Sequence, residues 1–453
     1  MPRKNTMYGR RRVLIGGASA GTLALAGCIG TGDPEEDDDE GTGDDTDDDS
    51  NGEDVEMADQ IDVWGWDVAA RSLELTADAY MEEYDATVDV EEFGQDAMKE
   101  DLRSRLTAGS GAPDVAMLEM IDGPAEIDTG AVADLTDRID DAGIEDDFVS
   151  GAWASLQEDG ATYAIPWDIG PTAVYYRRDI YEDHGLDADA IETWDDFQEE
   201  GEKLPDDIAM FNIPVNDLDG VWRFQFRQLG NRPFTEDGEV NIHNDDSVMI
   251  AETIKQLYDS GIASDYDGWS TEWFNGYGEG EIASLPSAAW MEGTLRAELP
   301  DTAGNWGVYR IPAHEAGGPR ASNWGGSSLM IPEQIEDGER ERAWDYLTWS
   351  LATEEMQLLM YDEYGLFPAL ETTYDNDEVF DEELDFYDGQ PARRLFADVA
   401  EEMPEYQFSI DTPYVSDAIN NHLFRMLRDD EDPEEMVMEA AEEVAERTGR
   451  DLA

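Results

Sequence analysis

The sequence predicts an α/β protein built on parallel sheets. Short apolar runs that alternate with period two recur along the chain, segments with apolar residues at helical spacing separate them, and helix start and stop signals stand at several boundaries. Strands separated by helices are typically parallel, because each helix carries the chain back to the same edge of the sheet. With 453 residues, 40% of them hydrophobic, the chain is long enough for two domains of ordinary size.

The first elements are predicted in the order strand, helix, helix, strand. Residues 61–66, IDVWGW, alternate as a half-buried strand does. Apolar residues over 73–84 recur at helical spacing and predict a helix. A second helix over 98–106 is expected to stop at Gly109, a glycine suited to the position after a helix. Residues 113–118 then predict the next strand.

Later elements are marked by their ends. Residues 174–176, VYY, predict a strand. Thr193, with Asp196 three residues on, resembles a capping box that opens a helix. Asp432 and Pro433 predict the start of a final helix, with an N-cap and a proline at its first position.

Residues 1–27 have the composition of an export signal. Arg11 and Arg12 precede an apolar stretch that is too short to cross a bilayer core of about 30 Å, and Leu-Ala-Gly precedes Cys28, the only cysteine. The arginine pair resembles a twin-arginine signal, and Leu-Ala-Gly-Cys resembles a lipoprotein lipobox. The resemblance implies cleavage before Cys28 and a lipid anchor on its thiol. The alternative is a lone core cysteine after an uncleaved N-terminus.

Residues 28–56 predict an acidic linker. From Thr31 this segment is mostly Gly, Thr, Asp and Glu, with no Lys or Arg and almost nothing apolar. Such a segment buries too little apolar surface to offset its chain entropy. Like charges along it repel and extend it. We therefore expect a solvated tether between a lipid anchor and a folded body.

The charge balance restricts the partners of the whole chain. There are 111 acidic and 28 basic residues, a net charge of −83, with only four lysines among the basic residues. Nucleic acid and anionic membrane surfaces need positive charge, so neither is an expected partner. At molar salt the Debye length falls to about 3 Å and the self-repulsion is screened. The composition therefore predicts a salt-adapted, archaeal protein that folds in a salt-dependent way.

No motif in the sequence predicts an enzyme. Beyond the signal-like residues 1–27 the chain has no Gly-x-Ser-x-Gly elbow, and the whole sequence has no P-loop and no His-Glu-x-x-His run. A glycoside hydrolase needs two carboxylates, but 111 acids always supply a pair, so this criterion does not discriminate. With Cys28 lipidated, no disulfide or cysteine-based zinc site is expected. No metal or other cofactor is predicted, although a carboxylate-only cation site stays open.

The order of several segments resembles family 1 extracellular solute-binding proteins, the maltose-binding-protein-like receptors of sugar ABC importers. The similarity covers essentially all of residues 57–453. It rests on seven segments in sequence: YAIPWD at 163–168, AVYYRRDIY at 173–181, TWDDF at 193–197, AWMEG at 289–293, WGVY at 306–309, WGGSS at 324–328 and AWDYL at 343–347.

The resemblance implies a two-lobed, periplasmic-binding-protein-like fold, with a mainly parallel sheet in each lobe and a ligand cleft between the lobes. Lobe 1 would take 57–168 and 327–370, and lobe 2 would take 169–326 and 371–453. A hinge motion would close the lobes on a sugar or oligosaccharide. The implied function is that of a monomeric, lipid-anchored receptor on the extracellular face of the membrane, which delivers its ligand to ABC permease subunits without catalysis.

Candidate ligand-binding residues combine aromatic rings, which suit the C–H faces of sugars, with carboxylates, which suit the hydroxyl groups. Strand ends predict some of them, because ligands bind at the carboxyl edge of such sheets. The resemblance implies that Asp168 binds sugar hydroxyls and that Trp290 stacks under a sugar. The full set is Trp66, Asp67, Glu119, Trp167, Asp168, Trp222, Trp290, Glu292, Trp324 and Tyr414.

Each candidate has an alternative role. A tryptophan can serve the core, and any one acid of so many can be a solvated surface charge. Packing roles are expected for Trp64, Trp153, Trp194, Trp306, Trp344 and Trp349. The ligand class also stays open, since a polyamine or cation suits an acidic cleft. A phosphorylated polyol would need arginine, for which Arg71, Arg296 and Arg310 are the candidates.

Overall fold

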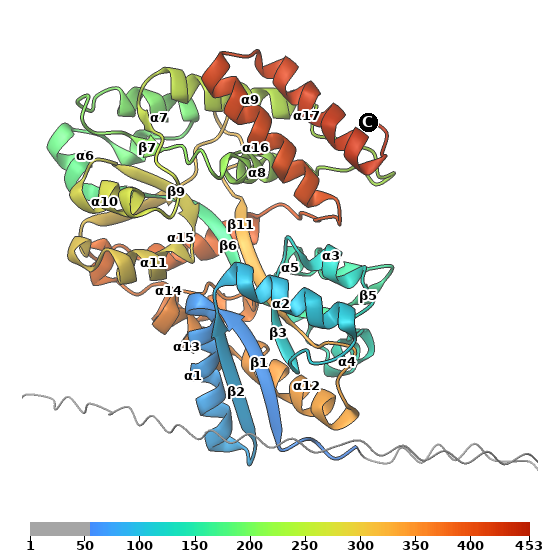
Figure 1. Ribbon diagram of the computed structural model, residues 1–453. Coiled ribbons are helices and arrows are strands. Elements are labelled where there is room, and N and C mark those ends of the chain that lie inside the picture. Colours follow the sequence, from blue (N-terminus) through green and yellow to red (C-terminus); the bar gives the residue numbers. More distant parts are fainter. Residues whose placement is uncertain (1–54) are drawn as a thin grey trace, which may run out of the picture. The chain divides into compact units, whose positions relative to one another are not determined.

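Seven strands form a sheet that runs through both lobes of an α/β fold (Figure 1). The computed structural model describes residues 55–453, so Arg11, Arg12 and Cys28 lie outside the described residues. The strand order is β10-β6-β11-β3-β1-β2, and β9 also pairs with β6. Strands β1, β2 and β3 belong to the first lobe, and β9 and β10 belong to the second.

The first lobe begins as the sequence predicts. Its elements are β1 (Gln60–Trp66), α1 (Asp67–Glu83), β2 (Thr87–Phe93), α2 (Gln95–Ala108) and β3 (Val115–Glu119). Strand β1 pairs in parallel with both β2 and β3, which confirms the predicted parallel pairing here. Helix α2 ends at Gly109, which has φ +66°, so a glycine is needed there as predicted.

Further short elements and two helices from late in the sequence complete the first lobe. Helix α1 packs on β2 and α13, and α12 packs on β1, so apolar side chains cover that face of the sheet. The added elements are α3 (Gly123–Ile127), α4 (Thr136–Ala142), α5 (Ser150–Trp153), β4 (Gln157–Glu158), β5 (Ala161–Thr162), α12 (Asp337–Leu351) and α13 (Glu354–Tyr364).

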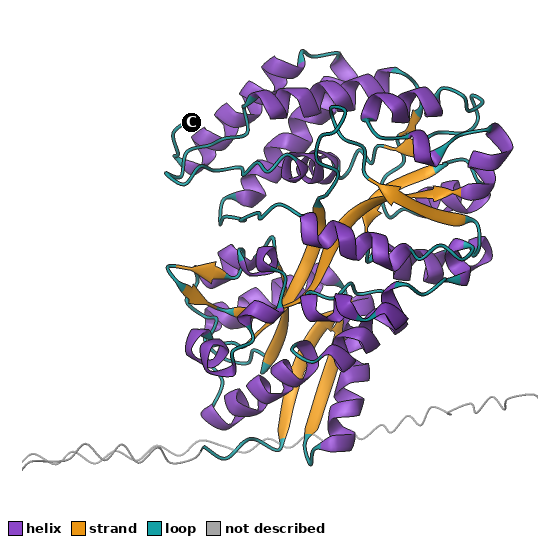
Figure 2. Cartoon of the chain, turned by 180° about the vertical axis from the view of Figure 1, so that it is seen from behind, coloured by secondary structure: helices purple, strands orange, loops and turns teal. Residues whose placement is uncertain are grey.

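Two long strands connect the lobes, and Figure 2 shows them from behind. They are β6 (Ala164–Arg177) and β11 (Asn323–Met330). The first part of β6 pairs with β11, and residues 172–177 pair with β9 (Ser284–Ala288) and β10 (Trp306–Arg310). All these pairs are antiparallel, so the mainly parallel pairing expected for each lobe is found in β1, β2 and β3 but not among these strands. The reason is that β6 and β11 cross between the lobes in opposite directions.

Helices surround the second part of the sheet. Helix α15 packs on β6 and β10, while α8, α9, α16 and α17 pack on one another. The predicted capping box at Thr193 and the predicted N-cap at Asp432 are both confirmed. The elements are α6 (Arg178–His184), α7 (Trp194–Gly201), β7 (Phe211–Asn212), α8 (Leu218–Gln228), α9 (Asp245–Asp259), β8 (Ala263–Ser264), α10 (Thr271–Glu279), α11 (Met291–Glu298), α14 (Asp377–Phe380), α15 (Ala392–Glu402), α16 (Thr412–Asp429) and α17 (Pro433–Thr448).

Within residues 55–453, no helix has the length and apolar character needed to cross a bilayer. In the same range, no group of three or more His, Cys, Asp or Glu side chains is arranged to hold a metal ion.

Candidate functional site

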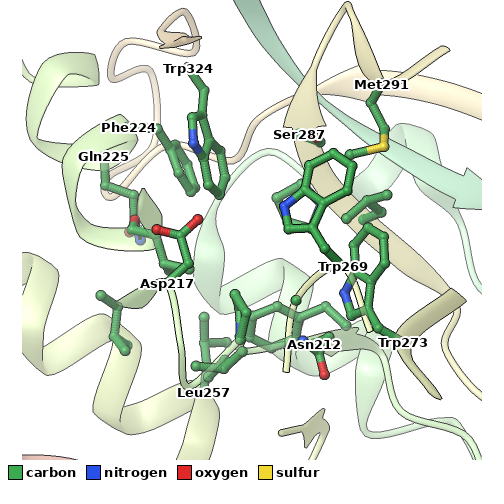
Figure 3. A pocket seen from close by; sticks show the side chains of 18 of the residues that line it. Asn212, Asp217, Phe224, Gln225, Leu257, Trp269, Trp273, Ser287, Met291 and Trp324 are labelled. Atoms are coloured by element: carbon green, nitrogen blue, oxygen red, sulfur yellow. Dashed lines mark hydrogen bonds between the residues drawn. The ribbon is translucent and has the colours of Figure 1, made fainter. Parts of the chain in front are cut away.

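An aromatic pocket opens in the second lobe beside the start of β11 (Figure 3). Two pairs of nearly parallel rings line it. The ring centroids of Trp269 and Trp290 are 5.9 Å apart at an interplanar angle of 18°, and those of Phe224 and Trp324 are 5.2 Å apart at 18°. In Figure 3 the indole of Trp269 faces Asp217, Phe224 and Trp324 across the open centre of the pocket.

Asp217 is the carboxylate of this pocket. It caps α8, and its Oδ1 accepts a hydrogen bond from the backbone N–H of Gly220 at 3.2 Å. Burial raises the pKa of Asp217 to about 6, and Arg223 opposes that shift. Gly220 also makes room for Trp324, since a Cβ there would lie 2.6 Å from the indole. The local sequence thus places an acid, with a partly protonated side chain near pH 6, against an aromatic wall.

The inner end of the pocket is apolar. Asn212, Gln225 and Ser287 are the other polar side chains among the lining residues besides Asp217, and none of those residues is a lysine or arginine. Such a site suits a neutral ligand that combines C–H surfaces with a few hydroxyl groups. The apolar part consists of Phe211, Ile213, Val221, Ile254, Leu257 and Leu285.

Trp290 ties the pocket to the strand that connects the lobes. Its Nε1 donates a hydrogen bond of 2.8 Å to the backbone oxygen of Trp324. Gly325 and Gly326 follow with φ of +92° and +122°, where the register between β6 and β11 shifts. The two glycines allow the bulge that turns Trp324 toward the pocket.

A second group of candidate residues lies at the carboxyl ends of β1 and β3 in the first lobe. Trp66 and Glu119 line one pocket there together with Lys99 and Asp122. The Lys99 ammonium lies 2.5 Å from Glu119, 2.7 Å from Asp122 and 5.6 Å from the ring centroid of Trp66. Gln95 donates a further hydrogen bond of 2.9 Å to Glu119. The group presents an aromatic face beside a chain of polar side chains.

Glu119 in the first lobe also acts on Asp217 in the second lobe. Burial is the main cause of the raised pKa of Asp217, and the negative charge of Glu119 adds a smaller contribution in the same direction.

Asp168 and Trp167 are buried where β6 crosses between the lobes. The carboxylate of Asp168 is 5% exposed and accepts hydrogen bonds from Ser327, from its backbone N–H at 3.0 Å and from its hydroxyl. Burial raises the pKa of Asp168 to about 6, and the bonds from Ser327 oppose the shift. Trp167 is buried and its Nε1 donates to Met360 Sδ at 3.2 Å. Both side chains join β6 to its neighbours.

Three other predicted residues lie apart from the aromatic pocket. Glu292 is 1% exposed and accepts a hydrogen bond of 3.2 Å from Tyr387. Tyr414 is exposed on α16 beneath the guanidinium of Arg447, 4.6 Å from the ring centroid. Asp67 is exposed at the first position of α1 with φ +47°.

Trp222 and the tryptophans expected to pack are mostly interior. Trp222 is fully buried on α8 and stacks on Phe226, with centroids 4.2 Å apart. Of the six expected to pack, four are buried and two are half-buried. The buried ones are Trp64, Trp153, Trp194 and Trp306; the half-buried ones are Trp344 and Trp349.

The pocket brings together Trp290 and Trp324, which the sequence predicts as ligand-binding residues, with Asp217, Phe224 and Trp269, which it does not. Asp217 had a usable signal, since an Asp three residues before Gly220 opens an apolar helix. Trp269 and Phe224 had none, because their positions depend on β7 and β8 pairing and on α8 lying beside β11.

Comparisons with known proteins agree with this fold. A two-lobed α/β fold crossed by two strands defines a class of ligand receptors, the periplasmic-binding-protein-like proteins. The family model for "Bacterial extracellular solute-binding protein" matches residues 76–384. The chain therefore belongs to the bacterial extracellular solute-binding protein family.

Relatives of the chain carry names that specify sugars. The arabinooligosaccharide-binding protein of Halalkalibacterium halodurans is 27% identical over 410 residues, covering 87% of this chain and 90% of the relative. The lactose-binding protein of Rhizobium radiobacter is 27% identical over 403 residues, which cover 86% of this chain and 93% of the relative. The structure of an ABC-transporter-associated binding protein from B. animalis subsp. lactis, in complex with β-1,6-galactobiose, has a TM-score of 0.74 at 27% identity. The match covers 87% of this chain and 99% of that one.

Proposed function

We propose that this protein is the extracytoplasmic substrate-binding lipoprotein of an ABC transporter and that it captures a sugar or oligosaccharide between its lobes. The observation that carries the proposal is the aromatic pocket, in which Trp269 faces Trp324 and Asp217 across the open centre. Aromatic faces and an adjacent carboxylate match the C–H surfaces and hydroxyl groups of a sugar ring. The relatives named for arabinooligosaccharide and lactose, and the solved binding protein in complex with β-1,6-galactobiose, support the same ligand class.

A phosphorylated polyol fits the pocket less well. Binding proteins for sn-glycerol-3-phosphate are also related, at 22% identity. A phosphate group calls for arginine or lysine, and none lines the aromatic pocket. Lys99 in the first lobe is already paired with two carboxylates. A polyamine or another organic cation is the remaining alternative, because Asp217 beside indole rings would also suit an ammonium group.

Delivery to a permease requires that the lobes close on the ligand. In this proposal the crossing strands β6 and β11 form the hinge. The lobes divide near 168/169 and 326/327, so that they comprise 57–168 plus 327–370 and 169–326 plus 371–453. A ligand that touches Asp217 and Glu119 together shifts the equilibrium toward the closed form, because only that form makes both contacts. The closed monomer then presents both lobes to the permease.

Export and anchoring are proposed from residues 1–28. The Arg11–Arg12 pair directs export, and Cys28 carries the lipid that holds the mature protein on the extracellular face of the membrane. Residues 29–56 then act as the tether. Mass spectrometry of the mature N-terminus checks this: a lipidated cysteine at the terminus supports the anchor, and an unmodified Cys28 within a longer chain contradicts it.

The ligand class is tested by isothermal titration calorimetry on the purified protein in multimolar KCl. The panel contains lactose, β-1,6-galactobiose, arabinotriose, glycerol 3-phosphate, spermidine and Ca²⁺. Binding of a sugar that is recovered unaltered supports the receptor. A response only to spermidine, Ca²⁺ or glycerol 3-phosphate moves the ligand to another class, and consumption of the sugar would make the protein a glycoside hydrolase.

Asp217→Asn is expected to weaken sugar binding by about tenfold or more, since a hydrogen bond to a charged group contributes about 1.5–3 kcal/mol. Because burial raises the pKa of Asp217 to about 6, the charged acceptor is present above that pH. Affinity of the unaltered protein should therefore fall as the pH drops through about 6, and the variant should lose this dependence. Calorimetry from pH 5 to pH 8 measures both effects.

Asp217→Asn should change sugar binding without changing the stability of the fold. Asparagine caps a helix as well as aspartate does, so the melting temperature of Asp217→Asn should stay close to that of the unaltered protein. An unchanged affinity with an unchanged pH profile would remove Asp217 from the site.

We propose that the protein is halophilic. Its melting temperature should rise strongly between dilute buffer and multimolar KCl, because salt screens the repulsion within a chain of net charge −83. Differential scanning calorimetry measures the rise, and sucrose at equal osmolality controls for effects that do not depend on charge. A cooperative transition at the same temperature in dilute buffer would contradict the proposal.

A further inference from the structure

The most exposed large hydrophobic side chain among residues 55–453 lies at the mouth of the aromatic pocket. It is Trp269, which is 53% exposed. Its backbone has φ +66°, whereas the other non-glycine residues with positive φ in the described chain are all aspartates. A bulky residue in this left-handed region is strained, and glycine would adopt the same conformation without strain.

The loop that carries Trp269 is fixed by two asparagines. The side chain of Asn212 accepts from the backbone N–H of Tyr266 at 2.9 Å and donates to its carbonyl oxygen at 3.0 Å. The side chain of Asn216 accepts from the N–H of Gly268 at 2.7 Å and donates to its oxygen at 3.3 Å. Strained residues held by their surroundings in this way are concentrated at ligand-binding positions.

The same segment positions the carboxylate and the indole of the site. Asn212 and Asn216 precede Asp217 in one stretch of chain, so the bonds to the loop fix the position of Trp269 relative to Asp217. Figure 3 shows the indole of Trp269 facing Asp217 and Trp324 across the open centre of the pocket. The ring of Trp290 is nearly parallel to that of Trp269, with an interplanar angle of 18°. Its Nε1 donates a hydrogen bond to the carbonyl oxygen of Trp324.

We infer that Trp269 is the indole on which the sugar ring stacks and that Trp290 supports it from behind. The ligand ring then lies between Trp269 and Trp324, with a hydroxyl group on Asp217. This inference rests on the proposed function and specifies it, because the stacking surface of the pocket is assigned to a residue of the 265–270 loop, which connects β8 to α10.

The test combines affinity and stability of Trp269 variants. Calorimetry in multimolar KCl uses whichever of lactose, β-1,6-galactobiose and arabinotriose the unaltered protein binds. Trp269→Ala and Trp269→Gly should each weaken binding at least about fivefold, while Trp269→Phe should keep most of the affinity because it retains an aromatic face. Trp269→Gly should melt above Trp269→Ala, because glycine removes the backbone strain.

Phe424→Ala serves as the matched control, since Phe424 is 41% exposed on α16 and does not line the aromatic pocket. It should leave the affinity unchanged. Equal or tighter sugar binding by Trp269→Ala would overturn the inference, because Trp269 would then merely cover Trp290. That result leaves the proposed function standing, whereas an unaltered protein that binds none of the three sugars would contradict the proposed function.

Discussion

Replacing Arg393 by alanine is expected to lower the free energy of unfolding by about 3–5 kcal/mol, the usual cost of breaking a buried ion pair from one side. Arg393 is 1% exposed and lies 3.8 Å from Glu292, 3.1 Å from Asp362 and 3.5 Å from Glu382. Glu292 is itself 1% exposed, so the substitution leaves a carboxylate in the interior with only the exposed Arg296 as an ion-pair partner. Denaturant titration in a fixed salt concentration measures the loss.

Two further variants separate the buried pair from its surroundings. Arg296→Ala removes a partner of the same carboxylate that is 42% exposed, and it should cost no more than about 1 kcal/mol. The double variant Arg393→Met, Glu292→Gln removes both buried charges and should recover most of the stability. If Arg393→Ala costs no more than Arg296→Ala, the pair has no structural role.

The second large effect is expected at the crossing strands. Gly170→Ala should cost about 3 kcal/mol or more, at or above the upper end of the usual range for overpacking. A Cβ at this position would lie 2.1 Å from the backbone oxygen of Trp324 and 3.0 Å from the Cβ of Ala288. The backbone cannot easily move away, since the N–H of Gly170 donates a hydrogen bond of 2.7 Å to the side-chain oxygen of Asn323. Thermal and denaturant unfolding of the variant measure the cost.

The Gly170 substitution should also weaken sugar binding. Displacing Trp324 moves the carbonyl oxygen that holds the Trp290 indole. Gly151→Ala is the control, because its Cβ would meet no atom closer than 3.8 Å and alanine favours the helix. Near-native stability of Gly170→Ala would show that β6 and β11 can separate here without cost.

Local signals predicted much of the fold. The alternation in residues 61–66 predicted β1, and Gly109, Thr193 and Asp432 marked helix ends correctly. These features depend on a few neighbouring residues. For that reason a single sequence is sufficient to find them.

Strand β6 was largely missed from its own sequence. Only residues 174–176 predicted a strand, although β6 extends over Ala164–Arg177. Pro166, Gly170 and Pro171 interrupt the pattern, and these residues normally argue against a strand. They are accommodated because β6 changes partners at this point, from β11 to β9 and β10. Such a change of partners is a property of the tertiary structure.

The aromatic pocket shows the same limit. Trp290 and Trp324 were candidates from their segments, but Trp269 and Asp217 come together only through the bonds of Asn212 and Asn216 to a loop some 50 residues away. Conversely, Glu292 was a candidate because of its place beside Trp290, yet it lies on the buried side of α11 next to Arg393. A helix turns by about 100° per residue, so neighbours in sequence face different surroundings.

The peptide group of Trp324 limits how the receptor can be re-engineered. Its carbonyl oxygen accepts the Trp290 hydrogen bond and lies against Gly170, so one peptide belongs to the pocket wall and to the crossing strands at once. Grafting the pocket of another receptor onto this chain would therefore also alter the joint between the lobes. Altered selectivity is more safely sought in the 265–270 loop. Its backbone is bonded to the side chains of Asn212 in β7 and of Asn216 just after it, and these bonds do not involve the crossing strands.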